Sequence, residues 1–199
     1  MSYRPITDTW ILTRCKYKNG IKRFGGYLGG FPERARSLLN CSINEPLLHV
    51  CGGLAKYYPY NGGFGVNDKT MDLDQDTNPD ILHDVKKPFP LPLELWREGN
   101  VESDGIFNIP RFWKPKAYLC DPPYSEIDAA QYKTGAENYP SPNLILKNCF
   151  DVMEAGQRVG MIHYIVPKAP KNSKFIACVG VVCGFNNRIR AYSVFEKTY

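Results

Sequence analysis

Four consecutive residues, Asp121-Pro122-Pro123-Tyr124, combine a carboxylate, two ring-locked backbone units and an aromatic ring. Each proline fixes φ at about −65° and removes a backbone N–H donor, so the segment presents its carbonyl oxygens rigidly. The carboxylate of Asp121 and the carbonyl of Pro122 would together accept hydrogen bonds from one amino group. The ring of Tyr124 would stack on a planar ligand. These residue types are therefore suited to holding a planar molecule that carries an amino group.

The strand expected before these residues would place them at the edge of a sheet. The apolar run Ala117–Cys120 predicts a buried strand that ends at Asp121. A second apolar run, 46–54, ends in Cys51-Gly52-Gly53, whose glycines permit close backbone approach. We expect these two strands to be neighbours where the strand order reverses, because ligands of open α/β sheets bind there. One crevice would then hold both loops.

The remaining strand signals predict the rest of the sheet. Strands are predicted at 69–74, 79–85, 159–166, 175–183 and 188–195, with a turn cluster at 184–187. Strands that alternate with helices indicate a doubly wound sheet, and the turn cluster indicates a terminal hairpin. The predicted fold class is α/β, with a Rossmann-like, mostly parallel sheet and a C-terminal antiparallel hairpin.

Two helices have recognisable ends in the sequence. The first is predicted over 32–40, because Pro32 suits the first helical position and Glu33 favours the positive end of the helix dipole. The second is predicted to begin after a Ser141 cap and to close at Gly156. The polar segment 125–139 is expected to form a lid or half-helix, in which Tyr132 and Tyr139 are expected to be surface or packing residues.

Length and composition limit the classes of protein to which this chain can belong. The chain has 199 residues, 43% of them hydrophobic, which predicts one domain (1–199) with an irregular insertion rich in proline and tryptophan at about 86–115. Its longest apolar runs are strand-sized, and its first residues lack a secretory signature, so we expect a cytoplasmic protein without a membrane association. The net charge of +5 is compatible with a nucleic-acid partner.

Cysteine and histidine usage argues against a metal site. The seven cysteines include no CxxC pair, and the three histidines show no spacing typical of metal ligands. We therefore expect reduced thiols and no bound metal.

In their order along the chain, these motifs resemble those of class I S-adenosylmethionine-dependent methyltransferases, specifically the DPPY-type amino-methyltransferases; the resemblance covers about residues 24–197. It implies that Cys51-Gly52-Gly53 passes under the methionine part of S-adenosylmethionine. It also implies that Asp72 binds the ribose hydroxyls, with Asp74 as the rival, and that Asp84, beside the apolar Val85, binds the adenine amino group. The family's loop usually has a GxG pattern after an acidic residue, from which Cys51-Gly52-Gly53 departs.

The resemblance also implies the reaction. Asp121, Pro122, Pro123 and Tyr124 would be the catalytic residues, and neither a metal nor a covalent intermediate is implied. Members of the family methylate exocyclic amino groups of nucleic-acid bases, and adenine N6 in DNA is the first candidate here. A target in a duplex would have to be flipped out of its stack.

Several alternatives stay open at this point. The substrate could be RNA, a nucleotide or a protein amide, or the chain could be a binding or scaffold subunit that keeps the fold without turnover. Segment 86–115 is the only candidate for a target-recognition element, so a protein partner could supply recognition.

Overall fold

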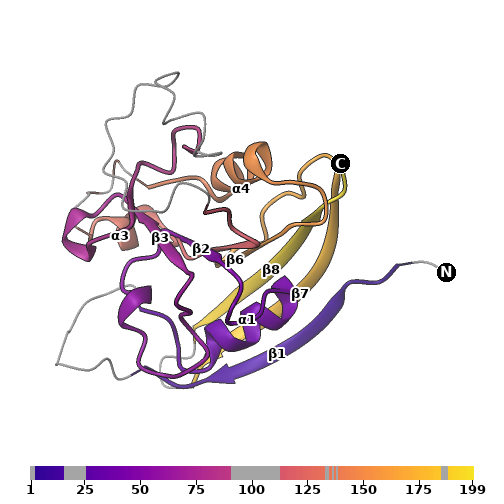
Figure 1. The fold of residues 1–199 in the computed structure, drawn as a ribbon. Helices are drawn as coiled ribbons and strands as arrows, with labels where there is room; N and C mark the ends of the chain where they lie inside the picture. Colours follow the sequence, from indigo (N-terminus) through magenta and orange to yellow (C-terminus); the bar gives the residue numbers. More distant parts are fainter. Residues whose placement is uncertain are drawn as a thin grey trace.

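The computed structural model describes residues 3–15, 26–90, 113–132, 135, 137, 139–184 and 188–199. Within this part of the chain, one eight-stranded sheet has the strand order β1-β7-β8-β6-β5-β2-β3-β4 (Figure 1). The strands are β1 (Ile6–Leu12), β2 (Leu47–Val50), β3 (Lys69–Asp72), β4 (Ile81–Leu82), β5 (Ala117–Cys120), β6 (Arg158–His163), β7 (Ser173–Cys183) and β8 (Ile189–Lys197). The helices are α1 (Phe31–Leu39), α3 (Glu126–Ala129) and α4 (Pro142–Val152), with 3₁₀ turns η2 (Ala55–Tyr57) and η3 (Gln75–Thr77).

The pairing of the strands confirms the predicted fold class. From β4 through β3, β2 and β5 to β6, each strand is parallel to its neighbour. β8 lies antiparallel between β6 and β7, and β1 is parallel to β7. The strand order reverses between β2 and β5, which is where a doubly wound sheet binds its ligands.

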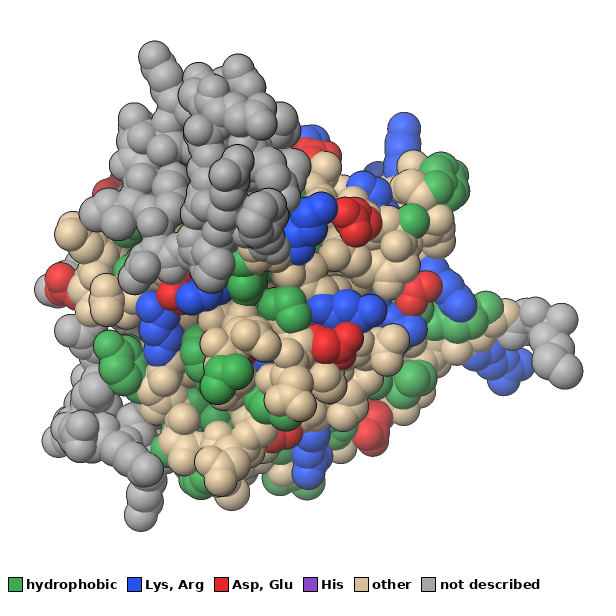
Figure 2. All heavy atoms as spheres, in the orientation of Figure 1, with side chains coloured by type: hydrophobic (Ala, Val, Ile, Leu, Met, Phe, Trp, Pro, Cys, Tyr) green, Lys and Arg blue, Asp and Glu red, His purple; other side chains and the backbone are tan. Residues whose placement is uncertain are grey.

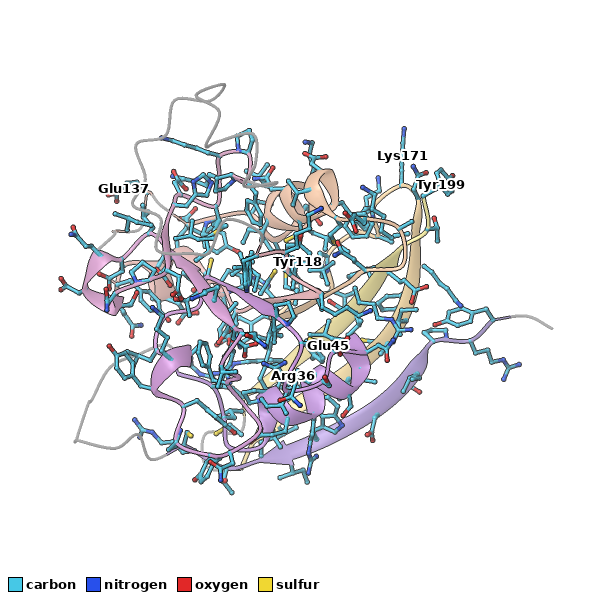
Figure 3. All side chains as sticks on the ribbon, in the orientation of Figure 1. Arg36, Glu45, Tyr118, Glu137, Lys171 and Tyr199 are labelled. Atoms are coloured by element: carbon cyan, nitrogen blue, oxygen red, sulfur yellow. The ribbon has the colours of Figure 1, made fainter. Side chains whose placement is uncertain are left out.

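The two faces of the sheet are buried in two separate core clusters. On β5, Leu119 packs into one cluster and Tyr118 into the other, as the two-residue period of a strand requires. Figure 3 shows Tyr118 in the interior, between the elements that cover the two faces. α1 contributes Phe31, Ala35 and Leu39 to the first cluster, and α4 contributes Ile145, Leu146, Cys149 and Phe150 to the second. Burial on both faces explains why the central strands are continuous apolar runs.

Local signals set the ends of α1. Gly30 precedes it with φ 81°, and Asn40 ends it with φ 51°. Pro32 stands in the first turn, followed by Glu33, as predicted. The predicted helix over 32–40 is therefore confirmed to within one residue at each end.

The signals for α4 are only partly correct. Ser141 stands at the N-cap position, but its side chain makes no capping hydrogen bond, so that predicted role is wrong. The helix ends at Val152, before Gly156, which has φ 84° and donates its N–H to the Lys197 carbonyl at 2.8 Å. Gly156 thus belongs to the turn into β6, because β8 binds its backbone there.

β1 was not predicted from the sequence. It pairs with β7 from Ile6 opposite Ala177 to Leu12 opposite Cys183, and only Trp10 and Leu12 are buried. Such an edge strand has too few buried positions to show a clear period of two. Its place is fixed by a partner about 170 residues away, together with the contacts of Trp10 with Phe31 and Tyr192 at 6.4 and 5.9 Å between ring centroids.

Other predicted segments differ in extent or lie outside the described residues. The strand predicted at 79–85 is reduced to Ile81–Leu82, so that Asp84 and Val85 lie beyond its end. Of the insertion at 86–115, residues 91–112 lie outside the described part, as do residues 185–187 of the hairpin turn. The pairing of β7 with β8 on either side of that turn is antiparallel, as expected for a hairpin.

A buried carboxylate, Asp68, connects α1 to β2. The Arg36 guanidinium donates to it, and His49 lies 3.2 Å from it. The backbone N–H groups of Leu47 and Gly65 donate to it at 3.1 and 2.7 Å. Burial raises the pKa of Asp68, but the hydrogen bonds of His49 and Arg36 outweigh it and hold the pKa below its usual value. Asp68 is therefore ionised and fully partnered in the core, and its partner Arg36 is labelled on α1 in Figure 3.

Replacing Asp68 by alanine should strongly destabilise the fold, because it leaves the buried charge of Arg36 without its partner. Loss of one member of a buried pair costs about 3–5 kcal/mol. Urea unfolding followed by circular dichroism measures the change. Asp151→Ala is the control, because it removes the exposed ion pair with Lys147 and should cost only about 0.3–0.5 kcal/mol. Equal effects of the two substitutions would contradict a structural role of the Asp68 network.

Candidate active site

The two predicted loops leave the sheet side by side. In the parallel pair of β2 and β5, Val50 stands opposite Cys120. The N–H of Asp121 donates to the Val50 carbonyl at 3.1 Å, which extends the pairing by one step. Cys51-Gly52-Gly53 and Asp121-Pro122-Pro123-Tyr124 therefore begin at the same edge of the sheet. The predicted adjacency of the two loops is confirmed.

The glycine loop is sharply bent. Cys51 and Gly53 have φ of 53° and 45°. A Cβ atom at Gly52 would lie 2.8 Å from the His49 carbonyl oxygen and 3.0 Å from a methyl carbon of Thr70, so only glycine fits there. Part of the requirement for glycine thus comes from packing against β2 and β3 themselves.

The two rival aspartates after β3 have different partners. Asp72 accepts the N–H of Gly53 at 2.7 Å and the N–H of Asp74 at 2.9 Å, which places its carboxylate against the glycine loop. Burial raises the pKa of Asp72, and the backbone donors oppose that rise. Asp74 instead caps η3 by accepting the N–H of Asp76 at 3.0 Å. The geometry favours Asp72 over Asp74 as the residue that faces a ligand.

Asp84 and Val85 follow β4 on the next strand outward. The Asp84 carboxylate accepts the N–H of Lys86 at 3.0 Å and remains half-buried. Val85 is 5% exposed and packs in the second core cluster, while its carbonyl accepts from the Asn148 side chain at 2.9 Å. The Val85 side chain is therefore a core residue, and the proposed contact of this segment with an adenine stays a prediction.

Asp121 is held by its own loop. The Tyr124 hydroxyl donates to its carboxylate at 2.6 Å. Burial raises the pKa of Asp121 to about 6, against the opposing effects of the Tyr124 hydrogen bond and the positive charge of Arg190. The carboxyl group is therefore mostly ionised at pH 7, and it accepts rather than donates hydrogen bonds.

Aromatic and cationic side chains surround Tyr124. The Arg190 guanidinium carbon lies 4.8 Å from the centre of its ring. The rings of Tyr164 and His163 lie at 4.9 and 5.7 Å between centroids. These side chains come from the carboxyl end of β6 and from β8, so the site extends across more strands than the two with predicted loops.

The tautomer of His163 follows from its neighbours. Its Nδ1 accepts the N–H of Ile165 at 3.2 Å, so Nε2 carries the proton of the neutral ring. Burial lowers the pKa of His163, while the Pro123 carbonyl, as an acceptor, favours its protonated form. The hydroxyl of Tyr139 lies 3.4 Å from Nε2. His163 thus supports the diproline loop from the side of β6.

Sequence reasoning missed Arg190, His163 and Tyr164, and it assigned Tyr132 to the surface or to packing. Burial raises the pKa of Tyr132, and the charges of Asp121 and Asp72 raise it further, so Tyr132 interacts with both carboxylates. His163 and Tyr164 could have been found, since they lie within the strand predicted at 159–166, whose observed end is His163. Arg190 gave no signal, because its position depends on the pairing of β8.

The described residues contain neither a metal-binding cluster nor a membrane-spanning helix. No cluster of three or more His, Cys, Asp or Glu side chains has an arrangement that could hold a metal ion. None of the described helices has both the length and the apolar composition needed to cross a membrane.

Comparison with known proteins gives likeness of fold only. No family model and no curated protein sequence matches the chain. Among solved structures, TrmN from Thermus thermophilus has 14% identity and a TM-score of 0.48 over 87% of this chain and 50% of that one. The candidate methyltransferase yhhF from Escherichia coli has 11% identity and a TM-score of 0.48 over 89% and 90%. An rRNA methylase from Streptococcus thermophilus has 9% identity and a TM-score of 0.40 over 83% and 95%. At this level of similarity, the neighbours carry no conclusion about activity.

Removing the Tyr124 hydroxyl should raise the pKa of Asp121 above its value of about 6. A hydrogen bond to a charged group contributes about 1.5–3 kcal/mol, so Tyr124→Phe should raise the pKa by about one unit or more. A carbon-13 NMR titration of labelled aspartate carboxyl groups measures it. Tyr139→Phe is the matched control, because its hydroxyl contacts His163 instead. An unchanged pKa in Tyr124→Phe would contradict the hydrogen bond.

Proposed function

We propose that this chain is an S-adenosylmethionine-dependent methyltransferase that modifies an exocyclic amino nitrogen of a nucleic-acid base, with adenine N6 in DNA as the first candidate. The observation that carries the proposal is the adjacency of the Asp121 loop and the glycine loop at the ends of β5 and β2. It is the arrangement expected from the resemblance of these two motifs to DPPY-type amino-methyltransferases.

The residues around the glycine loop fit such a cofactor. The Asp72 carboxylate uses one lone pair of each oxygen on the N–H groups of Gly53 and Asp74. Each oxygen keeps capacity to accept a further hydrogen bond, which suits the two hydroxyls of a ribose. Asp84 stands after the next strand, at the place expected for an adenine amino group. Cys51-Gly52-Gly53 would hold the methionine part, and S-adenosylmethionine when bound supplies an electrophilic methyl group.

The Asp121 loop supplies what a poor nucleophile requires. An exocyclic amine shares its lone pair with the ring, so it reacts only when that lone pair is directed at the methyl carbon. The ionised Asp121 and the Pro122 carbonyl accept the two amine hydrogens and orient the nitrogen. Alignment of this kind can contribute about 7–11 kcal/mol to a displacement. The Tyr124 ring stacks on the base, a contact worth roughly 1–3 kcal/mol.

The surroundings of Tyr124 support a planar aromatic substrate over a protein amide. Beyond β6, the side chains of Tyr164, Ile165 and Val166 are 38%, 54% and 44% exposed, which gives a base an apolar surface beside the loop. The Arg188 side chain donates to the Tyr164 hydroxyl at 3.1 Å. A positive charge that could bind a phosphate of the nucleic acid therefore lies next to this apolar surface. Over the face drawn in Figure 2, Lys and Arg side chains are interspersed with Asp and Glu, so charge alone does not mark a nucleic-acid surface there.

The experiments below also test the alternative functions. The atypical glycine loop keeps a scaffold or binding subunit as the second candidate, and a protein partner would then supply the activity. RNA, free nucleotides and protein amides remain substrates to be tested beside DNA.

Methyl transfer should be detected directly. The protein is incubated with S-adenosylmethionine labelled in its methyl group and with single-stranded DNA, duplex DNA, RNA or bulk protein, and label in each polymer is counted. Asp121→Ala should reduce transfer by about 10²-fold or more, because the amine is no longer aligned. Asp151→Ala, on the exposed face of α4, should have the wild-type rate. Label in none of the four would refute the proposed activity, and label only in protein would refute the nucleic-acid substrate.

Cofactor binding should distinguish Asp72 from Asp74. At one hundred times the dissociation constant, S-adenosylmethionine should stabilise the protein by about 2.7 kcal/mol, which appears as a rise in melting temperature. Asp72→Ala should weaken binding by roughly ten- to a hundredfold, as loss of hydrogen bonds to a charged group does. Asp74→Ala should bind like the wild type, since its carboxylate caps η3. Equal losses in both variants would remove the assigned role of Asp72.

A further inference from the structure

Arg190 is a charged residue at the site that the proposed function does not yet use. It stands on β8 opposite Val181 of β7, and its guanidinium carbon lies 4.8 Å from the centre of the Tyr124 ring. Its Nε atom is buried and has no hydrogen-bond partner among the described residues. An unpaired buried donor is unfavourable, so packing alone does not explain an arginine at this position.

We propose that Arg190 is a positioning residue of the methyl-transfer site: its cation fixes the Tyr124 ring and, through the Tyr124 hydroxyl, the Asp121 carboxylate. The inference rests on the proposed function, and it assigns to that site a residue of β8. A cation over the face of a tyrosine ring is attracted by the negative charge of that face. The Tyr124 hydroxyl donates to Asp121 at 2.6 Å, so a ring held by Arg190 also holds the carboxylate.

Arg190 supplies the positive charge near Asp121, and three other titratable groups nearby do not. Cys120 precedes it on β5, Cys51 faces it from the glycine loop, and Tyr132 faces it from the segment after α3. Burial raises the pKa of each of these three groups, so all are neutral near pH 7. Among the described groups that act on the pKa of Asp121, Arg190 is the cation, and the Tyr124 hydroxyl is the hydrogen-bond donor.

The groups that face Arg190 itself are consistent with this assignment. Its charge interacts with Asp121, Tyr124, Tyr164 and Cys183. Asp121 is the carboxyl group in this set. The side chain of Arg190 therefore brings a positive charge from β8 into the surroundings of the carboxylate that directly follows β5.

The test compares Arg190→Gln, which keeps a polar side chain without charge, with Arg190→Lys, which keeps the charge. Carbon-13 NMR titration gives the pKa of Asp121 in each variant, and the dependence of methyl transfer on pH is measured in parallel. A nearby opposite charge lowers the pKa of a carboxyl group by about 1–3 units. Arg190→Gln should therefore raise the pKa of Asp121 by about one unit. The acid limb of the pH–rate profile should move to higher pH by the same amount. Arg190→Lys should stay near the wild type in both measurements.

Arg34→Met is the matched control for charge, because it removes an exposed arginine of α1 whose guanidinium lies over a different ring, that of Trp10, at 5.8 Å. The pKa of Asp121 should not change in it. An unchanged pKa in Arg190→Gln, or an equal rise in Arg190→Lys, would overturn the inference. The NMR result decides this without turnover. If the wild type transfers no methyl group while the pKa shifts as expected, the proposed function fails but the coupling between Arg190 and Asp121 stands.

Discussion

The parallel pairing of β2 with β5 is the constraint on which the candidate site depends. Val50 and Cys120 are opposite one another, and each strand ends at that pair. A slip of one residue would exchange the side chains that face the α1 cluster with those that face the α4 cluster. On β5 that exchange would place Tyr118 where Leu119 now packs. Packing on both faces thus fixes the register, and the register places Asp121 beside the glycine loop.

Buried carboxylates hold the strands that lead to the site. Asp68 binds the N–H of Leu47 at the start of β2, and Asp80 binds both the N–H and the hydroxyl of Thr70 in β3. Buried ion pairs often contribute little net stability compared with apolar residues of the same volume. Their effect here is geometric, since each carboxylate accepts from a loop or helix as well as from a strand. The starts of β2 and β3 are thereby fixed relative to one another.

The parts of the site that could be predicted are those that the local sequence determines. The run Ala117–Cys120 and the loop that follows it form a strand and its end wherever the sheet places them, and the predicted bounds of β5 are those observed. Gly52 was recognisable because a tight turn next to β3 excludes any side chain. β1 pairs with β7, which lies about 170 residues away in the sequence. Arg190 reaches the site because β8 also pairs with β6, with Ala191 opposite His163. No local pattern encodes such a partner.

The choice between Asp72 and Asp74 also needed the three-dimensional structure. Asp72 ends β3 and Asp74 lies two residues beyond it, so the sequence alone left both as candidates for binding a ribose. Only the three-dimensional structure distinguishes them, because it shows the Gly53 N–H donating to Asp72 and the Asp76 N–H donating to Asp74. The distinction arises from the bend of the glycine loop, whose positive φ at Cys51 and Gly53 turns an N–H toward β3.

The contacts of Tyr124 also restrict how a base could enter the proposed site. Its hydroxyl is used by Asp121, so the ring is fixed at one end and cannot slide along the loop. Arg190 lies over the ring at 4.8 Å and occupies one of its faces. A base that stacks on Tyr124 would also meet the rings of Tyr164 and His163, whose centroids lie 4.9 and 5.7 Å from that of Tyr124. Burial raises the pKa of Asp121, and the Tyr124 hydrogen bond and the Arg190 charge oppose that rise. The group proposed to accept the amine and the ring proposed to orient the base are therefore held by one hydrogen-bonded pair.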